Sequence, residues 1–312
     1  MKKVTVGIPV FNGEKSIKKA IDSVLNQTFR DFEIIISDNA STDSTKEICE
    51  EYSKSNDEIT YIQQKKNLGY IKNFLYTLNY TKSIYFVWLS ADDFWEPTFL
   101  EKNISILDSK KDIVGSTGKI GIIGNYYHKF DYDQNDNIII KFYKKIRQHY
   151  LSLEYFGTYA GKYEDRVRMC LKSFRYGLFI FSVFRTDILK KSANFHIIPW
   201  DWGLILLILK YGNLHVIDEV LQYRNPGGIS NSNAISFFRQ RNIQLYHLLF
   251  PKIPFTKWCM KNLGLKIFFQ NIIFFIRINY SGSIIILLDL LKYFRLQTNR
   301  KNYYFEKDLL PE

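Results

Sequence analysis

The sequence contains little of what marks a secreted, fibrous or disordered protein. Its three cysteines, Cys49, Cys170 and Cys259, are widely spaced and form no Cys-x-x-Cys pair, which argues against a disulfide framework and a thiolate zinc site. Only 7 prolines and 16 glycines occur in 312 residues, of which 46% are apolar, so a collagenous or low-complexity chain is excluded. We expect a globular protein of a reducing compartment.

Long uncharged hydrophobic runs are also missing. The opening MKKVTVGIPVFNG breaks at Pro9 and Gly13 before a signal-peptide core is complete. Toward the C-terminus, Lys266, Arg277 and Asp289 interrupt the apolar stretches, so none reaches the roughly 18 residues that a spanning helix needs. We expect neither a signal peptide nor a membrane-spanning helix.

Acidic residues are in deficit, with 31 Asp and Glu against 43 Lys and Arg, a net charge of +12. Residues 251–312 hold 10 basic and 4 acidic residues, and therefore carry half of the excess. A basic balance is typical of proteins that bind nucleic acid, anionic membranes or phosphate groups. No RNP-like, helix-turn-helix or zinc-finger pattern accompanies it, so we expect no nucleic-acid partner.

Strands and helices are predicted to alternate over about the first hundred residues. Short β-branched runs that end in polar residues are separated by segments with helical periodicity. The predicted strands are Val4–Phe11, Phe32–Asp38, Ile59–Gln64 and Ser83–Ser90, and the predicted helices are Ser16–Asn26, Ser41–Tyr52, Tyr70–Leu78 and Thr98–Asp108. Because parallel neighbours need helical crossovers, this order predicts an α/β fold, a mostly parallel sheet with helices on both faces.

The pattern is looser beyond residue 110. Strands are predicted at Ile113–Ile123 and Gly177–Arg185, a strand pair or a strand plus turn at Leu214–Arg224, helices at Lys141–Phe156 and Asp201–Tyr211, and an exposed loop at Lys129–Asn137. From Phe255 onward, clusters of Phe, Ile and Leu alternate with Lys and Arg, which is typical of helices that lie on anionic lipid. The alternative is a pair of helices that pack on the rest of the chain or on another subunit.

Two adjacent carboxylates, Asp92 and Asp93, follow the fourth predicted strand. Two such groups repel each other unless a divalent cation takes oxygens from them and shares others with a diphosphate. The alternative is that one of them caps the helix near Pro97. In an open parallel sheet, ligands bind beyond the carboxyl ends of the strands, which favours a ligand-binding role in this position.

Other polar residues recur at the same strand ends. Asp38 could accept a hydrogen bond from the imide N–H of uracil or thymine; cytosine lacks this donor, although guanine also offers an N–H. The alternative is a turn or N-cap aspartate. Asn67, Gly69 and Asn73 open the third helix, where small and amide residues leave room for a pyrophosphate or a sugar. Asn-x-Gly is also common turn chemistry.

Three segments together resemble inverting glycosyltransferase family 2, which has a GT-A type fold. They are VTVGIPVFNGEKSIKKAIDSVLNQTFRDFEIIISDNASTDST, KKNLGYIKN and WLSADDFWEP, in the family's order and spacing over about the first hundred residues. The resemblance implies that Pro9, Phe11 and Asp38 line the pocket for the base. It also implies that Asp92 and Asp93 belong to the motif that binds the metal, Mg²⁺ or Mn²⁺, and the diphosphate.

One position departs from the family's pattern. Members commonly carry Asp-x-Asp-Asp at this strand end, whereas this chain has Ser90-Ala91-Asp92-Asp93. The leading carboxylate is absent. Related sequences with a serine there still look like transferases, so we keep the expected activity and leave the strength of metal dependence open.

The second half resembles the family more loosely. Its members usually carry a catalytic carboxylate near the start of a helix, and Asp201 is the only acid in PWDWGL. Inversion by a single displacement needs one base for the acceptor hydroxyl, and Trp200 and Trp202 could pack around it. The alternative is that Asp201 caps the helix. Arg224, by resemblance and charge, binds the diphosphate or lies in a surface turn. His196 and His215 are candidate bases by residue type alone, and no sequence context favours them over partly buried structural histidines.

The sequence therefore predicts an inverting transferase that moves a sugar from a nucleotide-diphosphate donor, expected to be a UDP-sugar. The expected acceptor is a glycan or lipid-linked saccharide in cell-surface polysaccharide synthesis, at the cytoplasmic face of the plasma membrane. We expect a donor-binding half at 1–110, an acceptor-binding half of the same unit at 111–250, and a basic hydrophobic helical tail at 251–312 that could lie on an anionic membrane surface. One alternative is an inactive binding scaffold, which Ser90 suggests. The other is a nucleotidyltransferase, but GIPVFNGEKS lacks the Gly-rich basic phosphate loop that a nucleotidyltransferase would be expected to carry.

Overall fold

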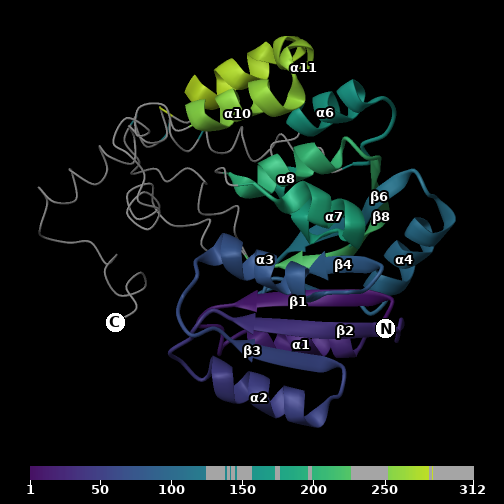
Figure 1. Cartoon of the computed structure of the whole chain (residues 1–312), viewed down its shortest axis with the longest axis vertical. Helices are drawn as coiled ribbons and strands as arrows, with labels where there is room; N and C mark the ends of the chain where they lie inside the picture. The colour runs from purple at the N-terminus through teal and green to yellow at the C-terminus, as the bar shows by residue number, and fades with distance from the viewer. Residues whose placement is uncertain are drawn as a thin grey trace, which may run out of the picture.

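An eight-stranded sheet runs through the computed structural model, which describes residues 1–123, 157–172, 176–195, 199–225 and 252–280 and the single residues 138, 141, 145 and 283 (Figure 1). The strand order is β3-β2-β1-β4-β7-β6-β8-β5. The strands are β1 (Val4–Val10), β2 (Phe32–Asp38), β3 (Ile59–Gln63), β4 (Tyr85–Trp88), β5 (Phe94–Trp95), β6 (Ile113–Ile122), β7 (Val183–Arg185) and β8 (Asn213–Arg224).

Most of the strands run in the same direction. β3, β2, β1 and β4 pair in parallel, and β6 pairs in parallel with β8. β7 is antiparallel to both β4 and β6, and β5 is antiparallel to β8. It follows that β6 and β8 run parallel to β4, so the carboxyl ends of β1, β2, β4, β6 and β8 all lie at one edge of the sheet.

Helices cover both faces of this sheet, as the alternation of strands and helices predicts. They are α1 (Ile17–Leu25), α2 (Thr45–Ser55), α3 (Tyr70–Tyr80), α4 (Phe99–Ser109), α6 (Tyr163–Lys172), α7 (Thr186–Ala193), α8 (Trp200–Ile208), α10 (Ile253–Leu263) and α11 (Leu265–Gln270). Val87 in β4 packs in one core with α1 and α4, whereas its neighbours Phe86 and Trp88 pack in a second core with α7 and α8. This alternation follows from the period-2 geometry of a strand.

The predicted elements of the first hundred residues are confirmed in type and order, with shifted ends. The largest shift is in α2, which begins at Thr45 and not at Ser41. The side chains of Ser41 and Asp43 are used in the preceding loop, where Ser41 donates to Asp38 and Asp43 accepts from the Thr45 N–H at 3.1 Å. Side-chain hydrogen bonds of this kind compete with the backbone hydrogen bonds of a helix, so the helix begins at a later residue.

Two predictions for the second half need correction. Only Val183–Arg185 of the predicted strand Gly177–Arg185 is a strand, and the 3₁₀ helix η2 (Tyr176–Phe181) precedes it. An apolar run cannot distinguish a buried strand from a buried helical turn. Leu214–Arg224 lies within one continuous strand, β8, with register shifts against β6 in place of a turn.

The predicted loop Lys129–Asn137 lies outside the described residues. The predicted helix Lys141–Phe156 also lies outside them, except for Lys141 and Lys145, which are both helical.

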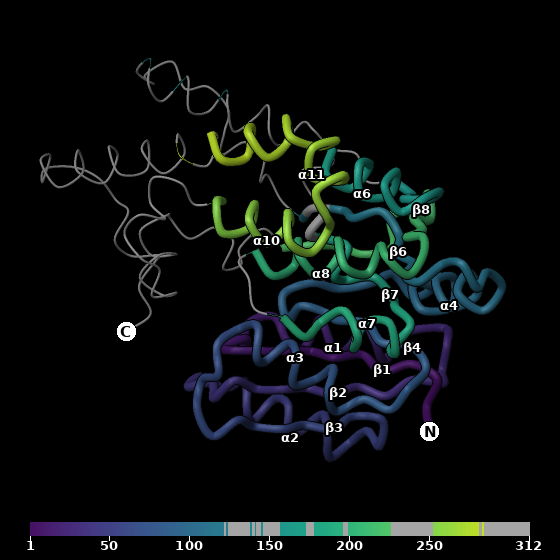
Figure 2. The backbone as a smooth tube through the Cα atoms, turned by 45° about the horizontal axis from the view of Figure 1, so that its top comes forward, coloured from purple at the N-terminus to yellow at the C-terminus, as the bar shows by residue number. Residues whose placement is uncertain are grey.

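The C-terminal helices pack on the rest of the chain. Phe255, Cys259 and Phe268 are buried in the same core as Trp200 and Leu204 of α8. Figures 1 and 2 both place α10 beside α8, and residues 272–280 continue as a helix beyond α11. The packing alternative is therefore correct for the inner face of these helices. Within the described residues, no helix is both long and apolar enough to span a bilayer.

Arg185, at the end of β7, ties the short antiparallel strand to its surroundings. Its Nε donates to the Ile113 carbonyl oxygen at 3.0 Å, and its Nη2 donates to the carbonyl oxygens of Leu107 and Lys110 at 2.7 and 3.2 Å. The last carbonyls of a helix have no partner within it, so this guanidinium serves the C-terminus of α4 and the start of β6 together.

We expect Arg185→Ala to lower the free energy of unfolding by about 2 to 3 kcal/mol, because three backbone acceptors lose a charged donor. Arg185→Lys should recover only part of the loss, since one ammonium cannot reproduce the planar fork. Denaturant unfolding measures both. Arg168→Ala is the control, because that arginine forms an exposed ion pair with Asp165, and a change below about 0.5 kcal/mol is expected. Equal losses in the two alanine variants would contradict this role of Arg185.

Candidate active site

The loops after β1 and β2 are tied together by hydrogen bonds at the carboxyl edge of the sheet. The Asn39 N–H donates to the Val10 carbonyl oxygen at 2.8 Å, and the Asn12 N–H donates to Ser41 Oγ at 2.9 Å. In return, Asn12 Oδ1 accepts from the Thr42 N–H at 2.9 Å. Asn12 has a φ of 52°, a conformation that asparagine tolerates better than most residues. The two loops therefore form one rim.

Pro9 and Phe11 differ in their access to this rim. Pro9 is buried in β1 and lies opposite Ser37 of β2. The Phe11 side chain, directly after the strand, is 49% exposed. An exposed aromatic ring beside a strand end offers a face on which a flat ring can stack.

Asp38 is fully buried at the end of β2. Its Oδ1 accepts hydrogen bonds from the Ser41 N–H and hydroxyl, and its Oδ2 accepts from the Tyr61 hydroxyl at 2.8 Å. Burial and the bond to Asp38 raise the pKa of Tyr61, so Tyr61 stays a donor. A carboxylate offers about four lone-pair sites, of which these donors occupy three, and the fourth is out of contact with solvent because Asp38 is fully buried.

Asn39 is a member of this region that the sequence interpretation missed. Its Nδ2 donates to Asn67 Oδ1 at 2.9 Å, and its Oδ1 accepts from the Leu68 N–H at 2.7 Å. Asn67 Oδ1 also accepts from the N–H of Gly69, which has a φ of 81° and precedes α3. Asn39 therefore fixes the loop that opens α3 against the end of β2. Its place directly after Asp38 was the only signal for this role.

Asn73 lies below the rim and is buried. Its Nδ2 donates to the carbonyl oxygens of Ser37 at 2.9 Å and of Val10 at 3.4 Å, and its Oδ1 accepts from Ser37 Oγ at 2.6 Å. The amide is thus used to join α3 to β1 and β2. The structure places Asn73 behind the strand ends as a positioning residue.

The register of β5 brings Asp93 next to Arg224. Phe94 of β5 lies opposite Tyr223 of β8 in an antiparallel pair, so the residue before Phe94 faces the residue after Tyr223. The Arg224 Nε lies 3.2 Å from Asp93 Oδ2, and the Asn225 N–H donates to Asp93 Oδ1 at 3.0 Å. Asp93, which was predicted to bind the metal, and Arg224, which was predicted to bind the diphosphate, therefore form an ion pair with each other.

The Asp92–Asp93 pair is electrostatically costly in this position. Asp93 is 6% exposed, and burial raises its pKa to about 7, an effect that Asp92 reinforces and that Arg224 and the Asn225 N–H oppose. The described residues hold no cluster of three or more potential metal ligands. Mg²⁺ typically binds through one or two carboxylates together with substrate phosphates. Asp92 and Asp93 fit such a cation when a diphosphate supplies the remaining oxygens.

An aromatic cluster links this edge to α8. The Trp200 ring lies 5.8 Å from that of Trp88 and 6.4 Å from that of Phe74. Phe74 also contacts Phe181, over whose ring the Arg224 guanidinium lies at 4.7 Å. The cluster therefore runs from the end of β4 to the first turn of α8.

Asp201 follows Trp200 in that first turn. The N-cap of α8 is Pro199, and no side chain makes a capping hydrogen bond there. Asp201 therefore lies inside the helix, one residue after the first helical residue, and not at the N-cap position that capping side chains usually occupy. Through Trp200, Asp201 is connected to the strand end that carries Asp92 and Asp93.

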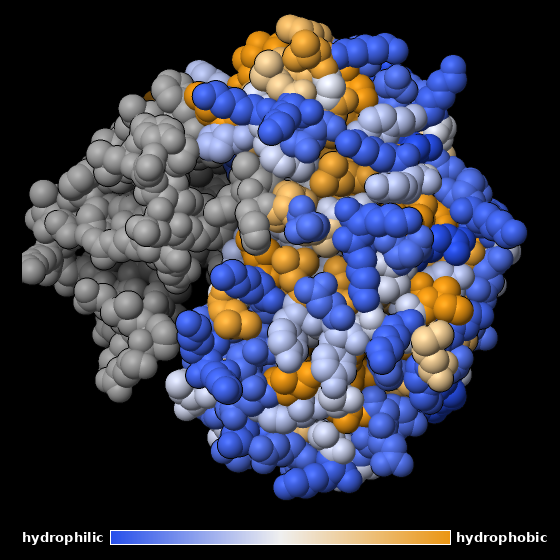
Figure 3. Space-filling model, in the orientation of Figure 1, coloured by the Kyte–Doolittle hydropathy of each residue, from blue (hydrophilic) through white to orange (hydrophobic). Residues whose placement is uncertain are grey.

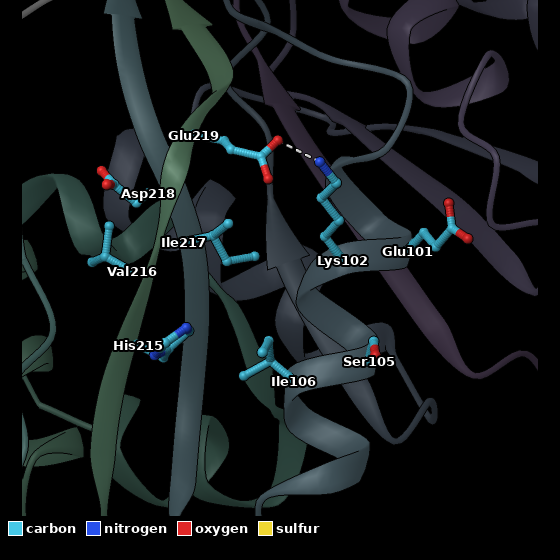
Figure 4. A pocket seen from close by; sticks show the side chains of 9 residues that line it. All are labelled: Glu101, Lys102, Ser105, Ile106, His215, Val216, Ile217, Asp218 and Glu219. Carbon is cyan, nitrogen blue, oxygen red and sulfur yellow. Dashed lines mark hydrogen bonds and ion pairs between the residues drawn. The ribbon is translucent and has the colours of Figure 1, made fainter.

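His215 does not join this constellation. It lines a groove of about 700 Å³ between α4 and β8, together with Glu101, Lys102, Ser105, Ile106, Val216, Ile217, Asp218 and Glu219 (Figure 4). An ion pair between Lys102 and Glu219 crosses the groove. Burial, with a smaller effect of Lys110, lowers the pKa of His215. None of the other predicted site residues lines this groove.

Comparison with known proteins gives the family to which the chain belongs. The model of the family described as Glycosyl transferase family 2 matches residues 5–190. The chain belongs to this family. An uncharacterized glycosyltransferase of Haemophilus influenzae is 34% identical over 141 residues, which are 42% of this chain and 43% of that protein. An uncharacterized glycosyltransferase of Methanocaldococcus jannaschii is 24% identical over 92% of this chain and 93% of its own length.

Solved structures of glycosyltransferases share the fold. Staphylococcus aureus TarS 1-349 in complex with UDP-GlcNAc matches with a TM-score of 0.56 and 18% identity, over 74% of this chain and 61% of that chain. The mannosyltransferase PcManGT from Pyrobaculum calidifontis, in complex with GDP-Man and Mn²⁺, matches with a TM-score of 0.55 and 13% identity, over 94% and 75%. The expected GT-A type fold of a family 2 member is thereby confirmed.

We expect Asn73→Ala to lower the free energy of unfolding by about 1 to 3 kcal/mol, because buried partners on β1 and β2 lose their donor or acceptor. The affinity of the folded variant for a nucleotide should change little, since the Asn73 amide is already used within the chain. Denaturant unfolding and calorimetry measure the two quantities. The control is Asn262→Ala, which removes one local bond to the Trp258 carbonyl oxygen. A large loss of nucleotide affinity at unchanged stability would assign Asn73 to the ligand.

Proposed function

We propose that this family 2 member transfers a sugar from a nucleotide-diphosphate donor to a saccharide hydroxyl, with inversion at the sugar carbon. The observation that carries the proposal is the contact between Asp93 and Arg224 at the edge where β1, β2, β4 and β8 end. A diphosphate needs cationic groups, and a bound cation needs carboxylates. Both are present at the position where ligands of parallel sheets bind.

The base of the donor is assigned to the rim after β1 and β2. Phe11 offers an exposed ring beside buried Pro9, and the fourth lone-pair site of Asp38 is the acceptor that we assign to an imide N–H. Uracil presents this donor and cytosine does not, while guanine also offers an N–H, so the contact disfavours a CDP-sugar; we propose a UDP-sugar as the donor. TarS has been solved with UDP-GlcNAc and PcManGT with GDP-Man, so relatives of the same fold differ in the base they bind.

The diphosphate is assigned to the space between the α3 opening and the Asp93–Arg224 pair. Asp92 and Asp93 would hold Mg²⁺ or Mn²⁺, which neutralises the leaving diphosphate when bound. Arg224 offsets the buried charge of Asp93 and still has N–H groups for a phosphate. Asn67 and Gly69 precede α3, an eleven-residue helix whose N-terminal N–H groups favour an anion.

The acceptor hydroxyl is assigned to Asp201. A single displacement requires a carboxylate that takes the hydroxyl proton on the face opposite the departing diphosphate. Asp201 lies in the first turn of α8, directly after Trp200. Trp200 holds this turn against Trp88 of β4, which supports a short path from the base to the donor.

The finer parts of the proposal concern the pathway. A glycan or lipid-linked saccharide in cell-surface polysaccharide synthesis is the acceptor class that we propose, with the chain at the cytoplasmic face of the plasma membrane. A putative glycosyltransferase of Bacillus subtilis, EpsE, is 31% identical over 117 residues. The serine at position 90 favours a second candidate function, an inactive nucleotide-binding scaffold. Release of UDP from a UDP-sugar distinguishes a transferase from such a scaffold.

Asp93→Asn should reduce transfer by on the order of 100-fold or more, because the cation loses a ligand while the Asn225 N–H keeps an acceptor. The affinity for Mn²⁺ in the presence of UDP should fall together with turnover, and EDTA should reduce the native protein to the variant's level. Asp187→Asn is the control, since Asp187 forms an exposed ion pair with Lys191. Full activity of Asp93→Asn, or of native protein in EDTA, would reject the metal assignment.

Asp201→Asn should lower kcat on the order of 10² to 10⁴-fold while UDP affinity stays within about twofold, because the base touches the acceptor and not the diphosphate. The amide has nearly the same shape, so the packing of Trp200 is retained. Steady-state kinetics and calorimetry with UDP provide the two readouts. Near-normal kcat would exclude Asp201 as the base, and lost UDP binding would give it a donor-side or structural role.

A further inference from the structure

The C-terminal helices carry apolar side chains on two opposite faces. One face is buried against the core and includes Phe268, Phe275 and Ile278. The other face is exposed and we call it the outer stripe; its members are 58% to 70% exposed and are Leu265, Phe269, Ile273, Ile276 and Tyr280. Leu265 and Phe269 are four residues apart within α11, and Ile273, Ile276 and Tyr280 are three and four residues apart within the helical residues 272–280, so each set lies on one side of its own helix.

The outer stripe is an unusual surface for a chain that has buried its core. Helices that pack on one side normally expose polar residues on the other. In Figure 3, hydrophobic residues gather at the top of the molecule, where Figure 1 places α11. Exposed contiguous apolar surface marks a site of interaction.

The charges around the outer stripe indicate the kind of partner. Residues 252–280 contain no acidic side chain and five basic ones, Lys252, Lys257, Lys261, Lys266 and Arg277. Lys266 follows Leu265 and Arg277 follows Ile276, so cations lie directly beside the stripe. Lys266 reaches Glu164 at 3.4 Å but stays exposed. Glu164 of α6 is thus an acidic neighbour contributed by another element, whereas the charges of residues 252–280 themselves are all cationic. Exposed Phe, Ile and Leu interleaved with cations is the composition of helices that lie on anionic lipid.

We propose that the outer stripe docks in the plane of an anionic lipid surface, with Leu265, Phe269, Ile273, Ile276 and Tyr280 inserted at the boundary between headgroups and acyl chains. The inner face stays packed on α8 and the rest of the core, so docking requires no unfolding of the C-terminal helices. This surface goes beyond the proposed sugar transfer and does not depend on it.

The test is sedimentation of the full chain with vesicles of phosphatidylcholine containing about 30% phosphatidylglycerol at low ionic strength, where electrostatic attraction is strong. Ile273→Glu and Ile276→Glu each replace an inserted side chain by a repelled one, and vesicle binding should fall at least about tenfold. The control is Ile84→Glu, because Ile84 is also exposed, at 55%, but precedes β4. Binding of this control should equal that of the native chain.

Thermal unfolding, analytical ultracentrifugation and UDP affinity of the same variants decide between occupants. The proposal expects unchanged melting temperature, unchanged association state and unchanged UDP affinity in both stripe variants. Lower melting temperatures would mean that the stripe is covered within the chain, and a lost dimer would mean that it binds a second copy; either overturns the proposal. Native protein that fails to sediment with anionic vesicles overturns it as well, whatever the outcome of the transferase tests.

Discussion

The parallel pairing of β1 with β2 and β4 is the constraint on which the rest of the structure depends. Parallel neighbours must be joined by crossovers, and these put helices on both faces of the sheet. Each strand is therefore buried up to the point where its loop begins. This explains why Pro9, Asp38 and Asp93 are all buried although they lie close to polar loops. The loops then lie at one edge and can be tied to each other, as Asn12, Asn39 and Ser41 are.

The burial of acidic groups at this edge determines the electrostatics of the site. Asp38 is compensated by donors from Ser41 and Tyr61, whereas Asp93 is compensated by Arg224 and a backbone N–H. Breaking such a pair from one side leaves an uncompensated buried charge, which is costly. A positive charge close to Asp93, from Arg224 or from a bound cation, lowers the cost of its buried negative charge.

Local sequence patterns predicted the first half of the fold because its strands and helices are each encoded by their own periodicity. Val4–Val10 is a mostly apolar, β-branched segment, and Phe32–Asp38 contains the apolar run Ile34–Ile36 before Ser37 and Asp38; such segments are typical of buried parallel strands. The 3₁₀ helix η2 was missed because the apolar residues Phe179–Phe181 carry no periodicity that distinguishes it from a strand.

The candidate site was predictable in residue type and less so in arrangement. Asp92, Asp93 and Arg224 follow from chemistry and resemblance, but their contact depends on the register of β5 against β8, which pairs segments far apart in the chain. Likewise, Asn73 has the amide that a ligand would need, yet only the structure shows that Ser37 and Val10 already use it. Long-range pairing leaves no local signal in one sequence.

The insertion of β7 between β4 and β6 has a mechanical consequence. Two short antiparallel pairings, Tyr85 with Arg185 and Gly115 with Phe184, join the strands β3-β2-β1-β4 and the strands β6-β8-β5 into one sheet. Rotating the two sides about a hinge would break these backbone hydrogen bonds in a buried region, where unpaired groups are costly. Any change of shape among the described residues is therefore expected in the loops at the carboxyl edge, over a sheet that stays intact.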